Sequence, residues 1–329
     1  MSTQSMDNQS KGTGGVRNVV SVIFARYGIY VALLVICILL TIATPFFLTV
    51  TNILNILNQV SIIGIIAVGS TIVLISGGLD LSPGAVVAVA GVMAAHFGHP
   101  GEWPLIMPIL VGLLTGAAIG VFNGVVVAKG KIPPFIVTLG TMTAGRGLAL
   151  LAVGGMQVIN LSEEFVSLAN TRAFGAVPIL IFFFAGVCLI FWFVTTRMKF
   201  GRHIYAVGGN ENAAHVSGLN VDRIKITVYG LAGALAGLGG LLLASRTVVG
   251  SPIAGAGYEL DAIAAAVIGG TSTTGGLGRV TGTIVGALLI QVIANGLDML
   301  NVPSYYQQIV KGLIIILAVF IDMRSKNKR

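Results

Sequence analysis

The sequence predicts an all-α, polytopic integral membrane protein of about ten transmembrane helices, in two halves of inverted topology with both termini cytoplasmic. The 329 residues are 55% hydrophobic and only 9% charged, with a mean hydropathy of +0.96. The apolar runs, of roughly 15 to 25 residues, match the length that a helix needs to cross ~30 Å of hydrocarbon. Membrane β-strands would instead show alternating segments of about 10 residues.

The first apolar run, GIYVALLVICILLTIATPFF, follows Lys11, Arg17 and Arg26 and so resembles a secretion signal. It has no small-residue cleavage site, and we interpret it as a retained first helix. The ten expected spans are 28–48, 53–76, 83–97, 104–128, 134–153, 176–196, 224–245, 259–270, 279–299 and 305–322.

Basic residues set the expected orientation. With an even number of spans, both termini lie on the same side of the membrane. The termini and loops of that side hold fifteen lysines and arginines, whereas the other side holds only two, Arg172 and Arg246. Arg146 and Lys311 lie near or within spans. Cytoplasmic loops are rich in Lys and Arg, so the basic side is the cytoplasmic one. We therefore expect a cytoplasmic tail at 1–26, a transmembrane domain at 27–322 with its largest cytoplasmic loop at 197–224, and a basic cytoplasmic tail at 323–329.

Glycines recur at every fourth position in two spans. Small residues at this spacing let membrane helices approach closely, whereas turn glycines keep no such period. The helix-packing candidates are Gly112, Gly116, Gly120, Gly124, Gly278, Gly282 and Gly286.

The two glycine runs also indicate an internal repeat. GLLTGAAIG (112–120) and GRVTGTIVG (278–286) share the frame G-x-x-T-G-x-x-x-G, and each precedes a loop that contains proline. Upstream, LDLSPGAVVAVAG (79–91) and YELDAIAAAVIGG (258–270) each give an acidic residue followed by a short apolar helix. Five spans therefore recur twice in opposite orientation, a pattern found in transporters.

The two shortest spans open with acidic residues. Asp80 precedes Ser82 and Pro83 in one, and Glu259 and Asp261 begin the other. Interrupted spans at matching places in two halves indicate a translocation pathway or gate. Helix capping is the alternative, with Ser82 as the cap before Pro83 and Asp261 as the cap of the second helix.

Uncharged polar side chains lie inside several spans. Such groups cost free energy in hydrocarbon unless they pair or face water. Amides without buried charges suit a neutral, hydrogen-bonding cargo better than an ion, and bonding between helices is the equally weighted alternative. The pathway candidates, with Asp80, Ser82, Glu259 and Asp261, are Asn55, Asn58, Gln59, Asn123, Gln291 and Asn295, and Asp298 is a further polar position.

Enzymatic function has little support in the sequence. Cys37 and Cys188 lie in apolar runs, and the four histidines lack metal-ligand spacing, so no catalytic or metal-binding residue is expected. GGTSTTGGLGR (269–279) resembles a phosphate loop but lacks the G-K-[ST] ending. Any ATP must therefore be bound by another chain, and no cofactor is expected in this one.

A polar loop separates the apolar spans 176–196 and 224–245, and it includes the stretch FGRHIYAVGGNENAAHVSGLNVDRIKI (200–226). Asn210 can cap a helix ENAAHVS that ends at Gly218, and Asp222 can cap the next span, while YAVGG has loop character. A helix of one or two turns is marginal alone, so the chain's inner face or a partner must hold it. A solvated loop is the alternative.

The chain resembles the membrane permease subunit of bacterial ABC importers for monosaccharides, the ribose-type family, nearly end to end. The stretches that carry the resemblance are ISGGLDLSPG (75–84), PPFIVTLGTM (133–142), GRHIYAVGGNENAAHVSGLNV (201–221), YELDAIAAAVIGGTSTTGGLGR (258–279) and SYYQQIVKG (304–312). Pro83 departs from the small residue that family members often have there.

The resemblance implies an inner-membrane permease that moves a monosaccharide such as ribose by alternating access. It implies as partners a second permease copy, most simply in a homodimer, a cytoplasmic ATPase that holds ATP and Mg²⁺, a periplasmic sugar-binding protein, and lipid, but no nucleic acid. The loop at 197–224 would couple to the ATPase through Gly208, Gly209, Asn210, Glu211, Ala213, Ala214 and Gly218. A branched-chain amino acid importer and an ion-coupled transporter are the alternatives.

Overall fold

The computed structural model describes residues 14–326, with residues 1–13 and 327–329 outside the described part. Within it, the chain forms thirteen helices and one two-stranded hairpin. Each expected span overlaps a helix. The corresponding helices are α1 (Gly14–Ala43), α2 (Val50–Ile75), α3 (Pro83–His96), α4 (Ile106–Ala128), α5 (Pro134–Ala152), α7 (Ile179–Arg197), α10 (Val221–Thr247), α11 (Tyr258–Ile268), α12 (Val280–Met299) and α13 (Ser304–Lys326). Residues 44–48 of the first expected span and 176–178 of the sixth lie outside α1 and α7.

The connections add three short helices and a hairpin. These are α6 (Glu163–Asn170), α8 (Lys199–Gly209), α9 (Glu211–Val216) and the strands β1 (Arg172–Ala173) and β2 (Val177–Pro178). Helix α1 begins at Gly14, so the predicted N-terminal tail overlaps it, and the described part of the predicted C-terminal tail continues α13. Six of the described helices are long and apolar enough to cross a membrane: α2, α4, α5, α7, α10 and α12.

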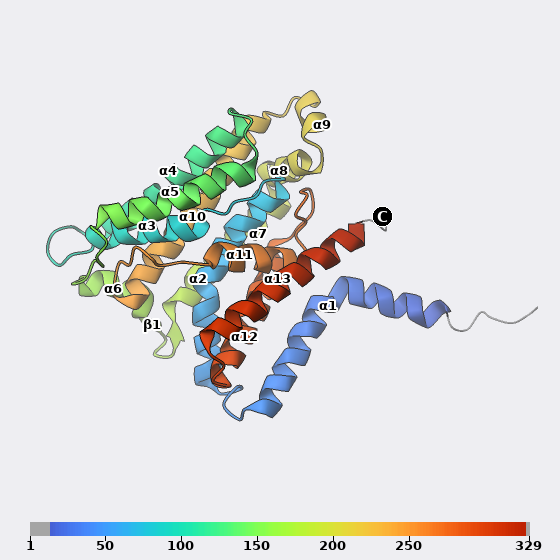
Figure 1. The fold of residues 1–329 in the computed structure, drawn as a ribbon, viewed down its shortest axis with the longest axis horizontal. Coiled ribbons are helices and arrows are strands. Elements are labelled where there is room, and N and C mark those ends of the chain that lie inside the picture. The colour runs from blue at the N-terminus through green and yellow to red at the C-terminus, as the bar shows by residue number, and fades with distance from the viewer. Residues whose placement is uncertain (1–13, 327–329) are drawn as a thin grey trace, which may run out of the picture.

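Helices α2 and α10 form the centre of the molecule, and most of their residues are buried. Helix α10 packs against α4 and α3 from the first half of the chain, while α2 packs against α12 and α11 from the second half. Figure 1 shows α4 and α5 as one layer beside α3 and α10, with α12 and α13 on the other side of α2. Each half therefore buries much of its surface on the other.

Glycine permits the closest of these contacts. A Cβ added to Gly116 of α4 would lie 2.7 Å from the Gly237 Cα of α10, and one added to Gly120 would lie 3.0 Å from the Gly233 Cα. These distances are too short for any side chain, so the two backbones touch directly. Gly112 and Gly124 face the same helix, whereas Gly282 and Gly286 of α12 face the end of α11 and Gly278 lies against Ile75 and Thr271.

Helices α3 and α11 are too short to span a bilayer alone. They contain 14 and 11 residues, about 21 and 17 Å of helix. Each is preceded by a non-helical segment, 76–82 before α3 and 248–257 before α11. The two helices begin beside each other, because Gly84 of α3 lies against Gly255 and Glu259 at the start of α11.

The two non-helical segments hide their backbone from hydrocarbon by bonding to neighbouring helices. The Leu79 carbonyl accepts hydrogen bonds from the Tyr229 hydroxyl (3.2 Å) and the Thr138 hydroxyl (3.4 Å). The Ala254 carbonyl accepts one from Arg146 Nη1 at 2.6 Å. Irregular backbone at membrane depth needs such donors, since no water is there to supply them.

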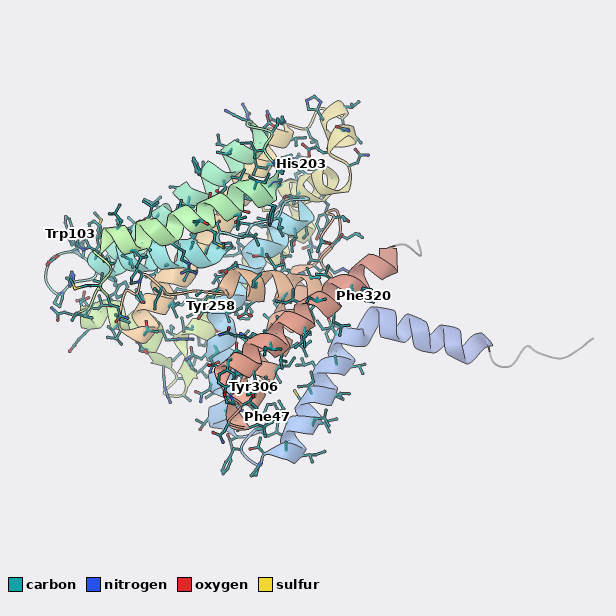
Figure 2. All side chains as sticks on the ribbon, in the orientation of Figure 1. Phe47, Trp103, His203, Tyr258, Tyr306 and Phe320 are labelled. Atoms are coloured by element: carbon teal, nitrogen blue, oxygen red, sulfur yellow. The ribbon has the colours of Figure 1, made fainter. Side chains whose placement is uncertain are left out.

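The molecule has two distinct ends. At the α9 end, which carries α8, α9 and the loop 269–279, the Gly276 amide donates to the Ile75 carbonyl at 2.9 Å. At the α6 end, which carries the loop 97–105, α6 and the hairpin, the Ser162 amide donates to the Gly98 carbonyl at 2.8 Å. Figure 2 shows Trp103 and His203 far apart, at the α6 end and the α9 end respectively.

Candidate functional site

Helices α8 and α9 form the surface of the α9 end. The sequence interpretation of YAVGG as a loop is wrong, because these residues belong to α8. Its apolar face, which includes Ile204 and Val207, is buried, and Gly208 lies against Ile75 and Gly276 so closely that no side chain would fit. Tertiary packing therefore keeps the two glycines helical where local propensity favours a break.

Helix α9 has the predicted cap. Asn210 Oδ1 accepts a hydrogen bond from the Ala213 amide at 2.9 Å, and Gly218 follows the helix at a φ of +83°. Ala214 faces inward and is buried, whereas Ala213 is exposed and Val216 is 86% exposed. An exposed apolar side chain on a capped surface helix can contact a partner.

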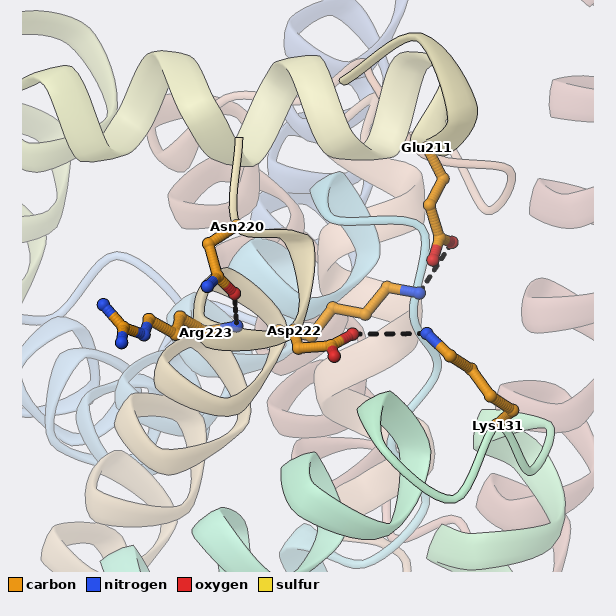
Figure 3. A network of polar contacts seen from close by, with 6 residues as sticks. Lys131, Glu211, Asn220, Asp222 and Arg223 are labelled. Carbon is orange, nitrogen blue, oxygen red and sulfur yellow. Dashed lines mark hydrogen bonds and ion pairs between the residues drawn. The ribbon is translucent and has the colours of Figure 1, made fainter. Parts of the chain in front are cut away.

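Two ion pairs join this surface to the start of α10 (Figure 3). Lys225 of α10 bonds Glu211 of α9 at 2.6 Å, and Asp222 of α10 bonds Lys131 of the α4–α5 loop at 3.2 Å. Asp222 was expected to cap α10, and this is wrong: the cap is Asn220, whose Oδ1 accepts from the Arg223 amide at 3.0 Å. Helix α9 is therefore joined to α10 by a side-chain ion pair as well as by the short connection 217–220.

Tyr205 ties α8 to the loop before α12. Its hydroxyl donates a hydrogen bond to the Gly278 carbonyl at 2.7 Å. Burial raises the pKa of this hydroxyl, and the nearby Arg279 acts in the opposite direction. The phenol thus stays protonated at neutral pH and keeps its donor.

A buried polar network occupies the segment before α3. Asp80 Oδ1 accepts from the Ser82 amide (2.8 Å) and hydroxyl (2.6 Å), and Asn123 Nδ2 of α4 donates to the Ser82 hydroxyl at 3.0 Å. The Thr141 hydroxyl of α5 donates to Asn123 Oδ1 at 2.5 Å. The Ser82 side chain does not cap α3. Sequence reasoning missed Thr141, which the pattern of small polar residues on α5 did not distinguish.

The acidic residues at the start of α11 have different surroundings. Asp261 was expected to cap the helix, but it lies in the first turn and forms an ion pair with Lys311 of α13 at 3.0 Å, while Gly257 at a φ of +85° begins the helix. Glu259 Oε1 accepts from the Gly257 amide at 3.3 Å. Among the described residues, Glu259 Oε2 is buried without a hydrogen-bond partner.

Most of the predicted pathway amides bond helix to helix. Gln59 of α2 bonds Gln291 of α12, and Asn295 of α12 exchanges two hydrogen bonds with Asn52 of α2, at 2.9 and 3.0 Å. On the same two helices, the hydroxyl groups of Thr71 and Thr283 are hydrogen-bonded at 2.6 Å. Asp298 accepts from Gln307 at 2.7 Å. Asn52 was missed, although its spacing of seven residues from Gln59 places both on one helix face.

Asn55 and Asn58 instead line a cavity of about 150 Å³ at the α6 end. Asn170 and Arg172 complete its polar wall, with Thr51 beside them. In the described part of the chain, Asn58 Oδ1 is buried without a partner, and Asn170 Nδ2 is held by the Ser245 carbonyl at 2.9 Å. The cavity thus offers amide and guanidinium groups to a small polar molecule.

Cys37 and Cys188 are free thiols, half-buried and buried respectively. Among the side chains that the structure describes, no group of three or more His, Cys, Asp and Glu is placed to hold a metal ion.

Comparison with known proteins gives a nearly full-length match. Residues 52–319 match the family described as "Branched-chain amino acid transport system / permease component". The ribose import permease protein of Bacillus subtilis (strain 168) is 42% identical over 304 residues, covering 92% of this chain and 94% of its own. The Haemophilus influenzae ribose import permease protein is 43% identical (91% and 94% covered), and the Escherichia coli (strain K12) D-allose transport system permease protein is 38% identical (90% and 91% covered). No solved structure matches the chain.

Proposed function

Because this chain belongs to the permease family of the branched-chain amino acid transport type, we propose that it is the membrane subunit of an ATP-driven importer for a monosaccharide. The observation that carries this conclusion is the identity of 42% to 43% with ribose import permeases over more than 90% of the chain. The protein is a multi-pass protein of the bacterial inner membrane, and its homologues are transport components rather than enzymes.

The α9 end is the cytoplasmic face and docks the ATPase. Lys129, Lys131, Arg202 and Arg223 belong to segments of this end, as the tendency of cytoplasmic loops to be basic requires. Helix α9 presents Ala213 and Val216 outward, while Ala214 and the ion pair between Glu211 and Lys225 tie it to the membrane helices. ATP and Mg²⁺ bind to the partner ATPase, and closure of that partner moves α9.

The α6 end faces the periplasm and accepts the sugar from its binding protein. The cavity formed by Asn55, Asn58, Asn170 and Arg172 opens there, and its amides suit a neutral cargo with many hydroxyl groups. The sugar then passes the polar network around Asp80 and Asn123, which α5 borders through Thr141.

The ten-span topology with inverted halves accounts for the packing. In it, α3 and α11 are the interrupted spans, each completed by the non-helical segment before it. The exchange of partners, α4 on α10 and α12 on α2, is what two interlocked inverted repeats would produce. The apolar faces of α4, α5 and α13 contact lipid or a second copy in a homodimer.

An uptake assay tests the proposal. The chain is reconstituted in liposomes with its ATPase and binding protein, and labelled D-ribose, D-allose and L-leucine are compared. We expect sugar uptake that requires ATP and persists when ion gradients are collapsed. Uptake of leucine alone would favour the amino acid alternative, and uptake driven by an ion gradient without ATP would favour a secondary transporter.

The Ala214→Pro variant tests the coupling role of α9. Proline at this position removes the hydrogen bond from the Ala214 amide to the Asn210 carbonyl (3.0 Å), which costs about 3 kcal/mol within a helix. We expect the protein to insert normally but to lose sugar-stimulated ATP hydrolysis and uptake. Full transport with normal ATPase retention would show that α9 is a solvated surface segment.

A further inference from the structure

Two charged side chains face each other at membrane depth where α3 and α11 begin. Arg146 of α5 reaches the Ala254 carbonyl with Nη1, and Glu259 of α11 lies next to it. Charged residues inside membrane proteins are rare and generally serve a function. In the described part of the chain, no direct ion pair joins them.

Glycine at position 84 creates the space between these groups. A Cβ on Gly84 would collide with Glu259 Oε2 and with the Gly255 carbonyl, and would lie 3.1 Å from Arg146 Nη2. The two charged groups thus border the same point. Their separation exceeds an ion-pair contact but is less than two hydrogen bonds placed end to end, ~5.5 Å. A separation in this range lets one hydroxyl group bond both side chains.

The corresponding acid in the first half, Asp80, receives two hydrogen bonds at one carboxylate oxygen. Asp80 occupies the place in LDLSPG that Glu259 occupies in YELDAI, and Asp80 Oδ1 is bonded by both the amide and the hydroxyl of Ser82. Glu259 Oε2 is buried and, among the described residues, has no hydrogen-bond partner. A buried carboxylate oxygen without a donor costs free energy, so a donor from outside the chain is expected there.

We propose that Arg146 and Glu259 form a cargo-binding subsite that recognises one hydroxyl group of the transported sugar. The hydroxyl oxygen accepts a hydrogen bond from Arg146 Nη2, and its proton is donated to Glu259 Oε2. Both side chains are half-buried, so neither is sealed inside the protein. This inference rests on the proposed function and assigns the ligand class as a neutral, polyhydroxylated molecule.

Recognition of a single hydroxyl can be tested with deoxy sugars. D-Ribose and its monodeoxy analogues are compared in the reconstituted complex, with wild type, Arg146→Ala and Glu259→Ala chains and one unchanged binding protein. The same binding protein is present with every chain. Its own preference among the sugars therefore cancels when the kcat/KM of a variant is divided by that of wild type for each sugar. In wild type, we expect one analogue to lose ~10- to 100-fold in kcat/KM.

The variants should remove that preference. In Glu259→Ala, the kcat/KM for D-ribose should fall by the factor that separates D-ribose from the critical analogue in wild type. The kcat/KM for that analogue should stay unchanged. Glu259→Gln keeps an acceptor and should retain most of the preference. If Glu259→Ala does not accumulate in membranes, Arg146→Lys is compared in the same way, and the preference should fall at least severalfold; an unchanged preference would overturn the inference.

Two glycine variants distinguish an effect on the subsite from the general effect of adding a methyl group to a helix. Gly84→Ala should displace Glu259 and lower the preference for D-ribose, whereas Gly140→Ala on α5, where a Cβ would meet nothing within 4 Å, should not. Equal losses for D-ribose and every analogue would overturn the inference and leave the proposed function standing. Failure of wild type to carry any sugar would overturn both.

Discussion

Asn52 and Asn295 exchange two hydrogen bonds across the contact between α2 and α12, and both side chains are buried. The paired amides satisfy each other in a region without water. Asn55, only three residues along α2, instead borders the cavity of the α6 end. Two asparagines less than one helical turn apart therefore have different surroundings, one bonded to a neighbouring helix and one lining a cavity.

Replacing one member of the pair should destabilise the protein more than replacing both. Asn52→Ala leaves the buried Asn295 amide without its partner, which costs ~1–3 kcal/mol, and Asn295→Ala leaves the Asn52 carbonyl oxygen unbonded while its amide nitrogen keeps the Phe47 carbonyl at 2.9 Å. The double variant removes both polar groups. The measurement is thermal unfolding in detergent, analysed as a double-mutant cycle. Asn55→Ala is the control and should change stability little. Strictly additive losses would contradict the pairing.

At the scale of elements, helix α9 is held by contacts of two kinds. Ala214 is buried beneath it, and the ion pair from Glu211 to Lys225 links its first turn to α10. A partly exposed ion pair contributes only ~0.2–1 kcal/mol to stability. We expect its main effect to be mechanical, since it links the position of α10 to that of α9.

Reversing this ion pair tests that role. Glu211→Lys alone and Lys225→Glu alone place like charges together, and we expect them to reduce sugar-stimulated ATP hydrolysis severalfold with little change in membrane abundance. The combined Glu211→Lys/Lys225→Glu chain should recover coupling, because the pair is restored with opposite polarity. Loss of coupling that persists in the combined chain would show that Glu211 acts on the ATPase directly.

The contact between α4 and α10 depends on glycine. Gly116→Leu would force a side chain into the Gly233 and Gly237 backbone, so we expect a loss of ~1–3 kcal/mol or more and little assembled protein. Membrane abundance and gel-filtration profile provide the measurement. Gly186→Leu on α7, where a Cβ meets nothing within 4 Å, is the matched control. Equal abundance of the two variants would contradict the contact.

At the scale of the whole molecule, the sequence predicts the helices well and their partners less well. Apolar length predicts the helices, and glycine spacing predicts where α4 and α12 pack closely, because both are local signals. The pairing of Gln59 with Gln291 and of Asp261 with Lys311 joins residues far apart in the chain, which periodicity does not encode. The helical state of Gly208 and Gly209 and the capping of α10 by Asn220 were missed for the same reason: tertiary packing selected among local options of similar free energy.

The orientation of the whole molecule can be tested with single cysteines. In a chain with Cys37 and Cys188 replaced by serine, a cysteine at Asn212 should resist a membrane-impermeant thiol reagent in intact cells. A cysteine at Ile159, which is 65% exposed at the α6 end, should react. Breaking the cells should make the first position reactive. Labelling of Asn212→Cys from outside would refute the cytoplasmic assignment of the α9 end.

Helices of the first half pack against helices of the second half, and this arrangement also constrains biosynthesis. Helix α4 is synthesised long before α10, the helix that covers its glycines. The interval between the synthesis of α2 and that of its partner α12 is longer still. During that interval the first half has its closest packing surfaces uncovered and its segment 76–82 without the Tyr229 donor. We therefore expect that neither half folds stably alone and that lipid shields the first half until the second is made.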